Sequence, residues 1–203
     1  PLAPRRGRVL VAEDNVVNQK VTARMLERLG FTAEVVGTGQ EAAAAARRER
    51  FDVILMDGQM PGMDGYEATR RIREREQETG GPRLPIVAMT ASAMKGDREK
   101  CLEAGMDDYV TKPVTPENLE AALRKWVGAA SAPAERAAAE PATSGTLLDE
   151  AVVQSLLSVD DDGTLMDEVV ATFLRIAPAR LAAIRKAAKG NAALLEREAH
   201  SFL

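Results

Sequence analysis

Acidic, basic and hydroxyl side chains stand where several short apolar runs end, and these residues have the types and spacing to do chemistry. They are Glu13, Asp14, Asp57, Thr90 and Lys112. Asp57 closes the run 53–56, which is typical of a strand buried on both faces of a parallel sheet. Open α/β sheets bind ligands at the carboxyl edge of such strands. The turn residues in 58–65 predict a sharp loop that leaves Asp57 displayed rather than buried.

The charges of this set favour a metal-assisted phosphoryl transfer. Two carboxylates about 4 Å apart repel by about 4 kcal/mol at an effective dielectric constant of 20. Three of them together need a cation, and a hard divalent ion such as Mg²⁺ suits oxygen ligands. Lys112 adds a second positive charge for an anionic substrate, and Thr90 offers a hydroxyl donor. This combination around Asp57 is what phosphoryl transfer to its carboxylate requires.

Alternating elements before residue 128 would position these side chains. We predict strands at 9–12, 31–36, 53–57, 86–89 and 109–111, and helices at 16–29, 37–50, 66–76, 97–104 and 116–127. Asn15 is a good N-cap for the first helix. Such alternation requires right-handed βαβ crossovers, so the predicted fold class is α/β with a doubly wound parallel sheet. The ends of strands one, three, four and five then meet at one edge.

The arginines of the third helix are predicted to lie on its solvent-exposed face. Arg70, Arg71, Arg73 and Arg75 lie within six residues. We expect them to form a solvated face rather than an anion-binding patch.

Composition divides the chain into four parts. Residues 1–7 are typical of a linker, 8–127 form the α/β domain, and the Ala-, Pro- and Glu-rich stretch 128–146 is a flexible linker. Residues 147–203 are predicted to be all helical, with a long helix at about 165–189 and another that starts at Asn191.

The overall composition excludes several classes of protein. The net charge of −4 gives no reason to expect a nucleic-acid partner. A single cysteine supports neither an internal disulfide nor a metal cluster, so we expect a cytoplasmic location. No apolar run approaches the ~18 residues of a membrane helix, although the parent protein could be membrane-anchored.

The motifs around the chemical residues resemble the signature of a two-component receiver (response regulator) domain over about 8–127. The matching residues are Glu13-Asp14, Asp57 in LMDGQMPGMDG, Thr90-Ala91 and Lys112-Pro113. The stretches VAEDNVVNQKV and QMPGMDGYEATRRIR resemble receivers of hybrid sensor histidine kinases more than those of DNA-binding regulators. The resemblance implies a flavodoxin-like strand order of 2-1-3-4-5.

The same resemblance implies a role for each residue. Asp57 would accept the phosphoryl group from a histidine kinase, and Lys112 and Thr90 would assist it. Glu13, Asp14, Asp57 and the backbone carbonyl of Gln59 would bind Mg²⁺, with Glu13 acting through water. Tyr109 matches an aromatic residue that turns inward when Thr90 moves. Gly58 and Gln59 fall at variable positions, so the lifetime of the aspartyl phosphate stays open.

The helical part resembles a histidine phosphotransfer (HPt) domain. The stretches ATFLRIAPARLAAIRKA and REAHSF carry the likeness, and His200 takes the place of the phosphorylated histidine. The chain stops at Leu203, so about half of the expected four-helix bundle is missing. A phosphorelay from Asp57 to His200 is the leading hypothesis, and the apolar helix faces leave room for a homodimer.

Three other functions compete with the relay. A response regulator could use the C-terminal segment for DNA binding or for another switched interaction, but no basic recognition helix is present. An aspartyl-phosphate phosphatase would need a second aspartate two residues after Asp57, where Gln59 stands. A flavin binder would need a phosphate loop after the first strand, where Glu13 and Asp14 would repel the phosphate.

Overall fold

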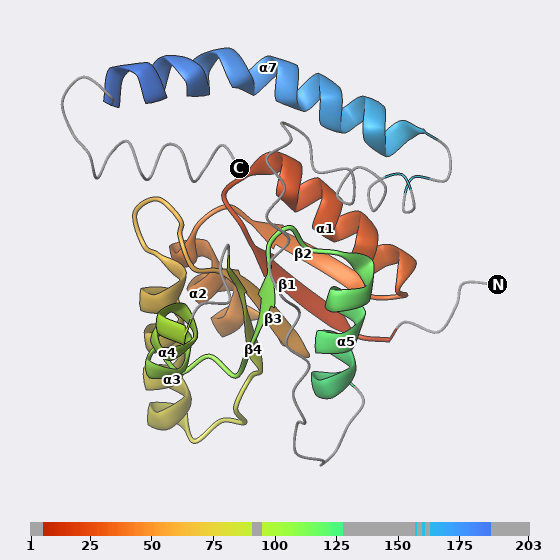
Figure 1. Cartoon of the computed structure of the whole chain (residues 1–203). Coiled ribbons are helices and arrows are strands. Elements are labelled where there is room, and N and C mark those ends of the chain that lie inside the picture. The colour runs from red at the N-terminus through yellow and green to blue at the C-terminus, as the bar shows by residue number, and fades with distance from the viewer. Residues whose placement is uncertain (1–5, 91–94, 128–156, 158–159, 161–162, 188–203) are drawn as a thin grey trace.

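A computed structural model describes residues 6–90, 95–127, 157, 160 and 163–187 of the chain. A five-stranded parallel sheet lies at its centre, with helices on both faces (Figure 1). In chain order the elements are β1 (Arg8–Ala12), α1 (Val16–Arg28), β2 (Thr32–Val36), α2 (Gly39–Arg48), β3 (Val53–Asp57), α3 (Gly65–Thr79), β4 (Ile86–Thr90), α4 (Lys95–Glu103), β5 (Asp108–Thr111), α5 (Pro116–Trp126) and α7 (Thr164–Ala187).

The strand order is β2-β1-β3-β4-β5, with every neighbouring pair parallel. This is the flavodoxin-like order expected from the motifs, so the predicted α/β fold class is confirmed. Each predicted strand and helix of the domain is present, with ends that coincide or differ by at most three residues. Parallel neighbours cannot be joined by a hairpin. The helix after each strand returns the chain to the end of the sheet where the next strand begins.

Alternation along the strands divides the core into two layers. Val9, Val11 and Leu55 face one layer, which α1 and α5 cover with residues such as Leu26 and Leu123. The intervening strand residues face a second layer, which contains the fully buried Ala42 and Ala45 of α2 together with residues of α3 and α4. Because successive side chains of a strand point to opposite faces, one apolar run fills both layers.

Side chains cap the starts of the helices. The side chain of Asn15 accepts a hydrogen bond from the Val17 N–H at 2.9 Å, which confirms the predicted N-cap of α1. Asp64 and Thr115 cap α3 and α5 in the same way. Such caps satisfy N–H groups that have no partner within the helix.

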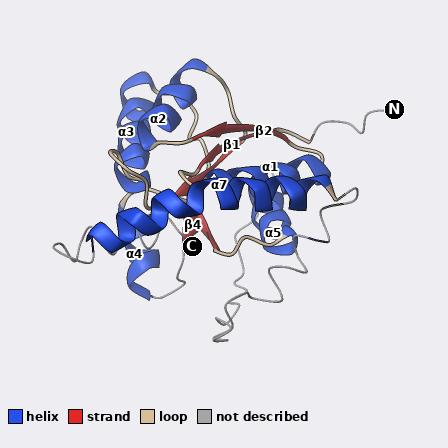
Figure 2. Ribbon diagram, turned by 90° about the horizontal axis from the view of Figure 1, so that it is seen from above, coloured by secondary structure: helices blue, strands red, loops and turns tan. Residues whose placement is uncertain are grey.

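The helix α7 lies outside the five-strand unit and packs along α1 (Figure 2). Its Leu165 belongs to the same hydrophobic cluster as Leu26 of α1, and Val169 packs against that cluster. The predicted long helix at about 165–189 is therefore confirmed as a helix. The linker 128–146, the predicted helix from Asn191 and His200 lie outside the described residues. Of the predicted four-helix-bundle segment 147–203, α7 is the helix that the structure describes. Within the part of the chain that the structure describes, no helix combines the length and apolarity needed to cross a bilayer.

Candidate functional site

The three predicted acidic residues come together at the carboxyl edge of the sheet. Glu13 and Asp14 follow β1, and Asp57 is the last residue of β3. The two strands are neighbours, with Ala12 opposite Met56. One carboxylate oxygen from each of the three residues lies within 4.8 Å of the others. The sheet register thus produces the acidic cluster that the sequence predicts.

Lys112 links two of these carboxylates. Its Nζ lies 2.7 Å from Oδ2 of Asp57 and 2.8 Å from Oε2 of Glu13. The residue follows β5, where its backbone N–H donates to the carbonyl of Thr90 at 2.7 Å, and its peptide bond to Pro113 is cis. The long side chain therefore reaches across the end of β4 to the acidic cluster.

Asp57 is buried, contrary to the expectation that it would be displayed. Only 2% of the residue is exposed. Asp57 is the last residue of β3, as predicted, and the Lys112 ammonium lies against its carboxylate. The Gln59 N–H donates to Oδ1 of Asp57 at 3.2 Å. A carboxylate that loses its water in this way keeps its charge only because charged and polar donors replace the water.

Glu13 is held by Asn15, Asn18 and Gln19, none of which was predicted to act at the acidic site. Its Oε1 accepts from the Asn15 N–H at 3.2 Å and from the side-chain amide of Asn18 at 3.1 Å. Its backbone carbonyl accepts from the side-chain amide of Gln19 at 2.6 Å. The run of amides directly after the acidic pair was the available signal. These bonds hold a residue that is only 1% exposed.

Burial and mutual repulsion set the charge state of the cluster. Burial raises the pKa of Glu13 above its ordinary value, and the nearby Asp57 charge adds to this effect. Burial also raises the pKa of Asp57, although the Lys112 ammonium opposes the rise. Burial alone would lower the pKa of Lys112, but the charges of Glu13 and Asp57 outweigh it and raise that pKa. The cluster therefore favours added positive charge.

The other predicted residues surround this cluster at different depths. Thr90 ends β4, is half-buried and lies opposite Thr111 of β5. Tyr109 of β5 is half-buried and packs against the core layer beneath α3 and α4. Gln59 is exposed on the loop after Asp57. His200 is the one predicted site residue outside the described part of the chain.

The loop after Asp57 is closed by two glycines. The Gly65 N–H donates to the Gly58 carbonyl at 3.2 Å, and a Cβ at Gly65 would overlap the carbonyl oxygen of Asp57. A Cβ at Gly58 would lie 2.9 Å from the hydroxyl oxygen of Tyr66. Glycine at both positions therefore allows the loop to approach the end of β3 closely.

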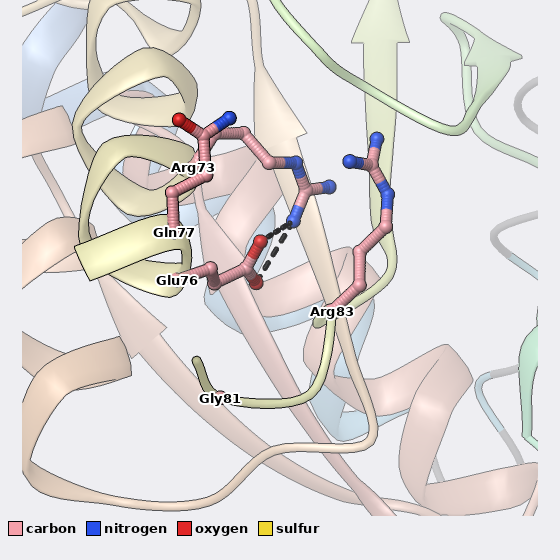
Figure 3. Close-up of a pocket in the computed structure, with 5 residues that line it drawn as sticks. All are labelled: Arg73, Glu76, Gln77, Gly81 and Arg83. Atoms are coloured by element: carbon pink, nitrogen blue, oxygen red, sulfur yellow. Dashed lines mark hydrogen bonds and ion pairs between the residues drawn. The ribbon is translucent and has the colours of Figure 1, made fainter. Parts of the chain in front are cut away.

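A second polar site corrects the expectation for the arginines of α3. Arg70, Arg71 and Arg75 are exposed, whereas Arg73 is buried. Figure 3 shows its guanidinium beside Glu76, at the wall of a cavity of about 190 Å³ that Gln77, Gly81 and Arg83 also line. The guanidinium also donates to Asp107 at 2.7 Å and to the backbone carbonyls of Gly105 and Leu84.

This second site has the character of a structural joint. Asp107 also pairs with Arg83 at 2.8 Å and accepts from the Ile86 N–H at the start of β4. The charges are matched within the cluster, and Ile86 lies at the opposite end of β4 from Thr90. The two sites therefore lie at opposite ends of the strands. Because the charges of the second site are matched, the acidic edge is the candidate for chemistry.

Comparison with known proteins identifies the α/β domain. The response regulator receiver domain family matches residues 9–124. Sensor protein GacS of Pseudomonas syringae pv. syringae is 45% identical over 130 residues, which cover 64% of this chain and 14% of that protein. Hybrid signal transduction histidine kinase I of Dictyostelium discoideum is 49% identical over 117 residues, which cover 55% of this chain and 7% of that protein. The chain thus spans only a small part of these curated relatives.

Solved structures give the same result. The receiver domain of sensor histidine kinase PA1611 from Pseudomonas aeruginosa PAO1, with a magnesium ion coordinated in its active-site cleft, is 46% identical, with a TM-score of 0.55 over 61% of this chain and 98% of that one. A co-crystal structure from Saccharomyces cerevisiae contains the histidine phosphotransfer signaling protein Ypd1 and the receiver domain of Ssk1. It matches at 34% identity and a TM-score of 0.57, over 59% of this chain and 88% of that one. The chain belongs to the response regulator receiver domain family of two-component phosphorelay signalling.

Proposed function

We propose that Asp57 accepts a phosphoryl group from a phosphorylated histidine of a histidine kinase. The observation that carries this proposal is the position of the Asp57 carboxylate, which ends a central strand beside Glu13 and Asp14 and lies 2.7 Å from the Lys112 ammonium. A carboxylate with cationic neighbours at the ligand-binding edge of a sheet is suited to nucleophilic attack on phosphorus.

The transfer step uses residues of the chain in defined roles. An oxygen of Asp57 forms a bond to phosphorus in line with the leaving group, the phosphorus–nitrogen bond breaks, and its electron pair returns to the imidazole of the donor. The Lys112 ammonium and the Thr90 hydroxyl bind phosphoryl oxygens as charge builds up on them. Because Lys112 is already held against Asp57, this positive charge needs no large movement to reach the phosphoryl group.

The acidic cluster fits a magnesium ion. Its carboxylate oxygens are hard ligands within 4.8 Å of one another. Burial, with a lesser contribution from a neighbouring carboxylate, raises the pKa of Glu13 and of Asp57, and a bound cation would favour the charged forms of both. Asp14, Asp57 and the backbone carbonyl of Gln59 would hold the ion directly, with Glu13 acting through water. When bound, Mg²⁺ offsets the negative charge that the carboxylates share with the phosphoryl group.

The Thr90 and Tyr109 pair is proposed to transmit the state of Asp57. Thr90 would move toward a phosphorylated Asp57, and Tyr109 would then turn inward and change the face formed by β4 and β5. Both side chains are half-buried, so neither is fully enclosed by the core.

The segment 147–203 is proposed to be part of an HPt domain whose His200 exchanges phosphate with a receiver. The helical state of Thr164–Ala187 supports this assignment, as does the family resemblance of REAHSF. The proposed units are linker 1–7, receiver 8–127, linker 128–146 and partial HPt segment 147–203, as in hybrid sensor kinases. Their proposed partners are a kinase phosphodonor domain and a downstream receiver or HPt protein. A second copy of the chain, in a homodimer, is a further proposed partner.

A second candidate is a response regulator whose phosphorylation switches an interaction of its C-terminal segment. The packing of α7 on α1 favours this candidate, because it couples that segment physically to the receiver. The label on His200 described below separates the two functions.

The acceptor assignment is tested with phosphoramidate, a small nitrogen-linked phosphodonor, in the presence of Mg²⁺. Wild type and Asp167→Asn, which changes an exposed carboxyl on α7, should take up a base-labile phosphoryl group. Asp57→Asn should take up none while circular dichroism shows an intact fold. Retained magnesium-dependent label in Asp57→Asn would overturn the assignment.

The relay is tested by the chemical stability of the label in wild type and His200→Gln. Acyl phosphate is base-labile, whereas phosphohistidine is acid-labile and base-stable. An acid-labile fraction that disappears in His200→Gln would support both relay steps in this chain. Base-labile label alone would exclude the relay to His200 and favour the second candidate.

A further inference from the structure

The backbone of Glu13 is held by hydrogen bonds to two other elements. Its N–H donates to the Val36 carbonyl of β2 at 3.1 Å. Its carbonyl accepts from the side-chain amide of Gln19 on α1 at 2.6 Å. Because these bonds fix the backbone, the freedom that is left to Glu13 lies in its side chain. The groups that contact the carboxylate therefore decide where its charge is placed.

The two carboxylate oxygens of Glu13 have different partners. Oε1 accepts from the Asn15 N–H at 3.2 Å and from Nδ2 of Asn18 at 3.1 Å. Oε2 lies 2.8 Å from Nζ of Lys112. A carboxylate oxygen offers about two acceptor sites, so these two donors occupy Oε1. A water that bridges Glu13 to an ion at the acidic edge would therefore meet Glu13 at Oε2.

Asn18 is the side chain that gives the carboxylate this orientation. The other donor to Oε1 is the backbone N–H of residue 15, which every residue type except proline would provide. The donor at position 18 exists only because the side chain carries an amide. Asn18 stands third in α1, where leucine is a better helix former than asparagine. The amide can thus be removed without a cost to the helix itself.

The orientation matters because Glu13 shares Lys112 with Asp57. Nζ of Lys112 lies 2.7 Å from Oδ2 of Asp57, almost as close as it lies to Glu13. A phosphoryl group on Asp57 would attract the ammonium and loosen its contact with Glu13. Glu13 is only 1% exposed, so bulk water is poorly placed to take over. The bond from Asn18 would then keep the buried carboxylate in place.

We propose that Asn18 is a positioning residue for magnesium at the acidic edge, because it holds Oε1 of Glu13 and so turns Oε2 toward the ion. This inference rests on the proposed function, which places Mg²⁺ at that edge. A ligand set that is oriented before the ion arrives binds it more tightly, since less order has to be imposed on binding. Loss of an outer partner of this kind typically weakens metal affinity by about 10- to 100-fold.

The test measures magnesium binding in the absence of any phosphodonor. NMR chemical shifts of the full-length chain, titrated with Mg²⁺, give the dissociation constant. Asn18→Leu keeps a side chain of similar size and removes the amide, and its dissociation constant should rise at least about tenfold. Asn118→Leu, the same substitution at an exposed position of α5, is the matched control and should keep the wild-type value.

A second background shows whether Asn18 acts through Glu13. In chains that carry Glu13→Gln, adding Asn18→Leu should cause no further loss of magnesium affinity, because the charge that Asn18 positions is gone. Asn18→Ala replaces Asn18→Leu if circular dichroism shows that the leucine variant does not fold. Wild-type affinity in the Asn18 variant, an equal loss in Asn118→Leu, or a loss that persists beside Glu13→Gln would each overturn the proposal.

Phosphoramidate labelling of the same chains separates this inference from the proposed function. Asn18→Leu should need more Mg²⁺ for half-maximal labelling but reach the wild-type rate when Mg²⁺ is saturating. A lower saturating rate with an unchanged magnesium requirement would show that Asn18 acts on the transfer step, and would overturn the positioning role. Absence of label in every chain would overturn the acceptor role of Asp57 and leave the binding measurements standing.

Discussion

At the scale of single residues, the acidic edge contains buried negative charges that are unfavourable for folding. Glu13 and Asp57 are almost fully buried, and one lysine is shared between them. A buried ion pair returns its desolvation cost only when its geometry and hydrogen bonds are good. The amides around Glu13 and the Gln59 N–H above Asp57 supply those bonds. Stability is thus given up at the position where a metal and a phosphoryl group would bind.

The burial of these carboxylates predicts how the free energy of unfolding depends on pH in the absence of metal. The pKa values of Asp57 and Glu13 are raised above 3.8 and 4.5, so the folded chain binds more protons than the unfolded chain above those values. The free energy of unfolding should therefore fall as pH rises from about 4 toward neutrality. Lys112, whose pKa is raised above 10.5, keeps its stabilising contribution throughout this range and loses it only at higher pH.

Asp57→Asn should flatten this dependence and raise the stability near pH 7, by about 1.4 kcal/mol for each pKa unit that is relieved. Urea unfolding at a series of pH values, with a metal chelator present, measures both effects. Asp167→Asn serves as the control and should follow the wild-type curve. If Asp57→Asn kept the wild-type slope, burial of Asp57 would not be the source of the pH dependence.

At the scale of elements, the end of α3 is joined to β4 and β5 by a charged cluster. Arg73 donates to Glu76 and to Asp107, which also bonds the first N–H of β4. Gly105, with φ of +94°, brings its backbone to within reach of this arginine. The cluster lies opposite the acidic edge, so it fixes the strands whose other ends carry Thr90 and Lys112.

Removing Arg73 should destabilise the domain strongly. Arg73→Met keeps much of the apolar stem but leaves the buried Asp107 and Glu76 without their partner, and breaking a buried pair in this way costs about 3–5 kcal/mol. Arg75→Met, at an exposed position of the same helix, should change the free energy of unfolding by less than about 0.5 kcal/mol. Chemical denaturation of the two variants gives the comparison, and similar values for both would contradict the structural role of Arg73.

At the scale of the whole molecule, the receiver has two core layers, whereas α7 packs along α1. The residues of β1 and β3 at the sheet centre are 0% exposed along most of their length, whereas Phe173, Leu174 and Leu181 of α7 are exposed. Local opening is easiest where few apolar side chains are buried. The receiver and α7 should therefore differ in their opening free energies.

Hydrogen exchange should resolve this difference. We expect amides of α7 to exchange through a local opening of low free energy, while those of β1, β3 and β4 exchange only through global unfolding. Mass spectrometry of peptides from the two regions, at several denaturant concentrations, measures this. Equal protection of α7 and the central strands would show that α7 is an integral part of the receiver fold.

The sequence by itself determined the five strands, the helices between them and the meeting of Glu13, Asp14 and Asp57. Apolar runs and turn residues define the elements locally, and right-handed crossovers then leave one parallel arrangement in which strand ends converge. Only the tertiary structure decided that Asp57 is buried, that Arg73 differs from its neighbouring arginines, and that α7 packs on α1. Each of these depends on a side chain that reaches a partner from a different element, as Lys112 reaches Asp57 from 55 residues away. Periodicity reports which face a residue occupies, but not which distant group will cover it.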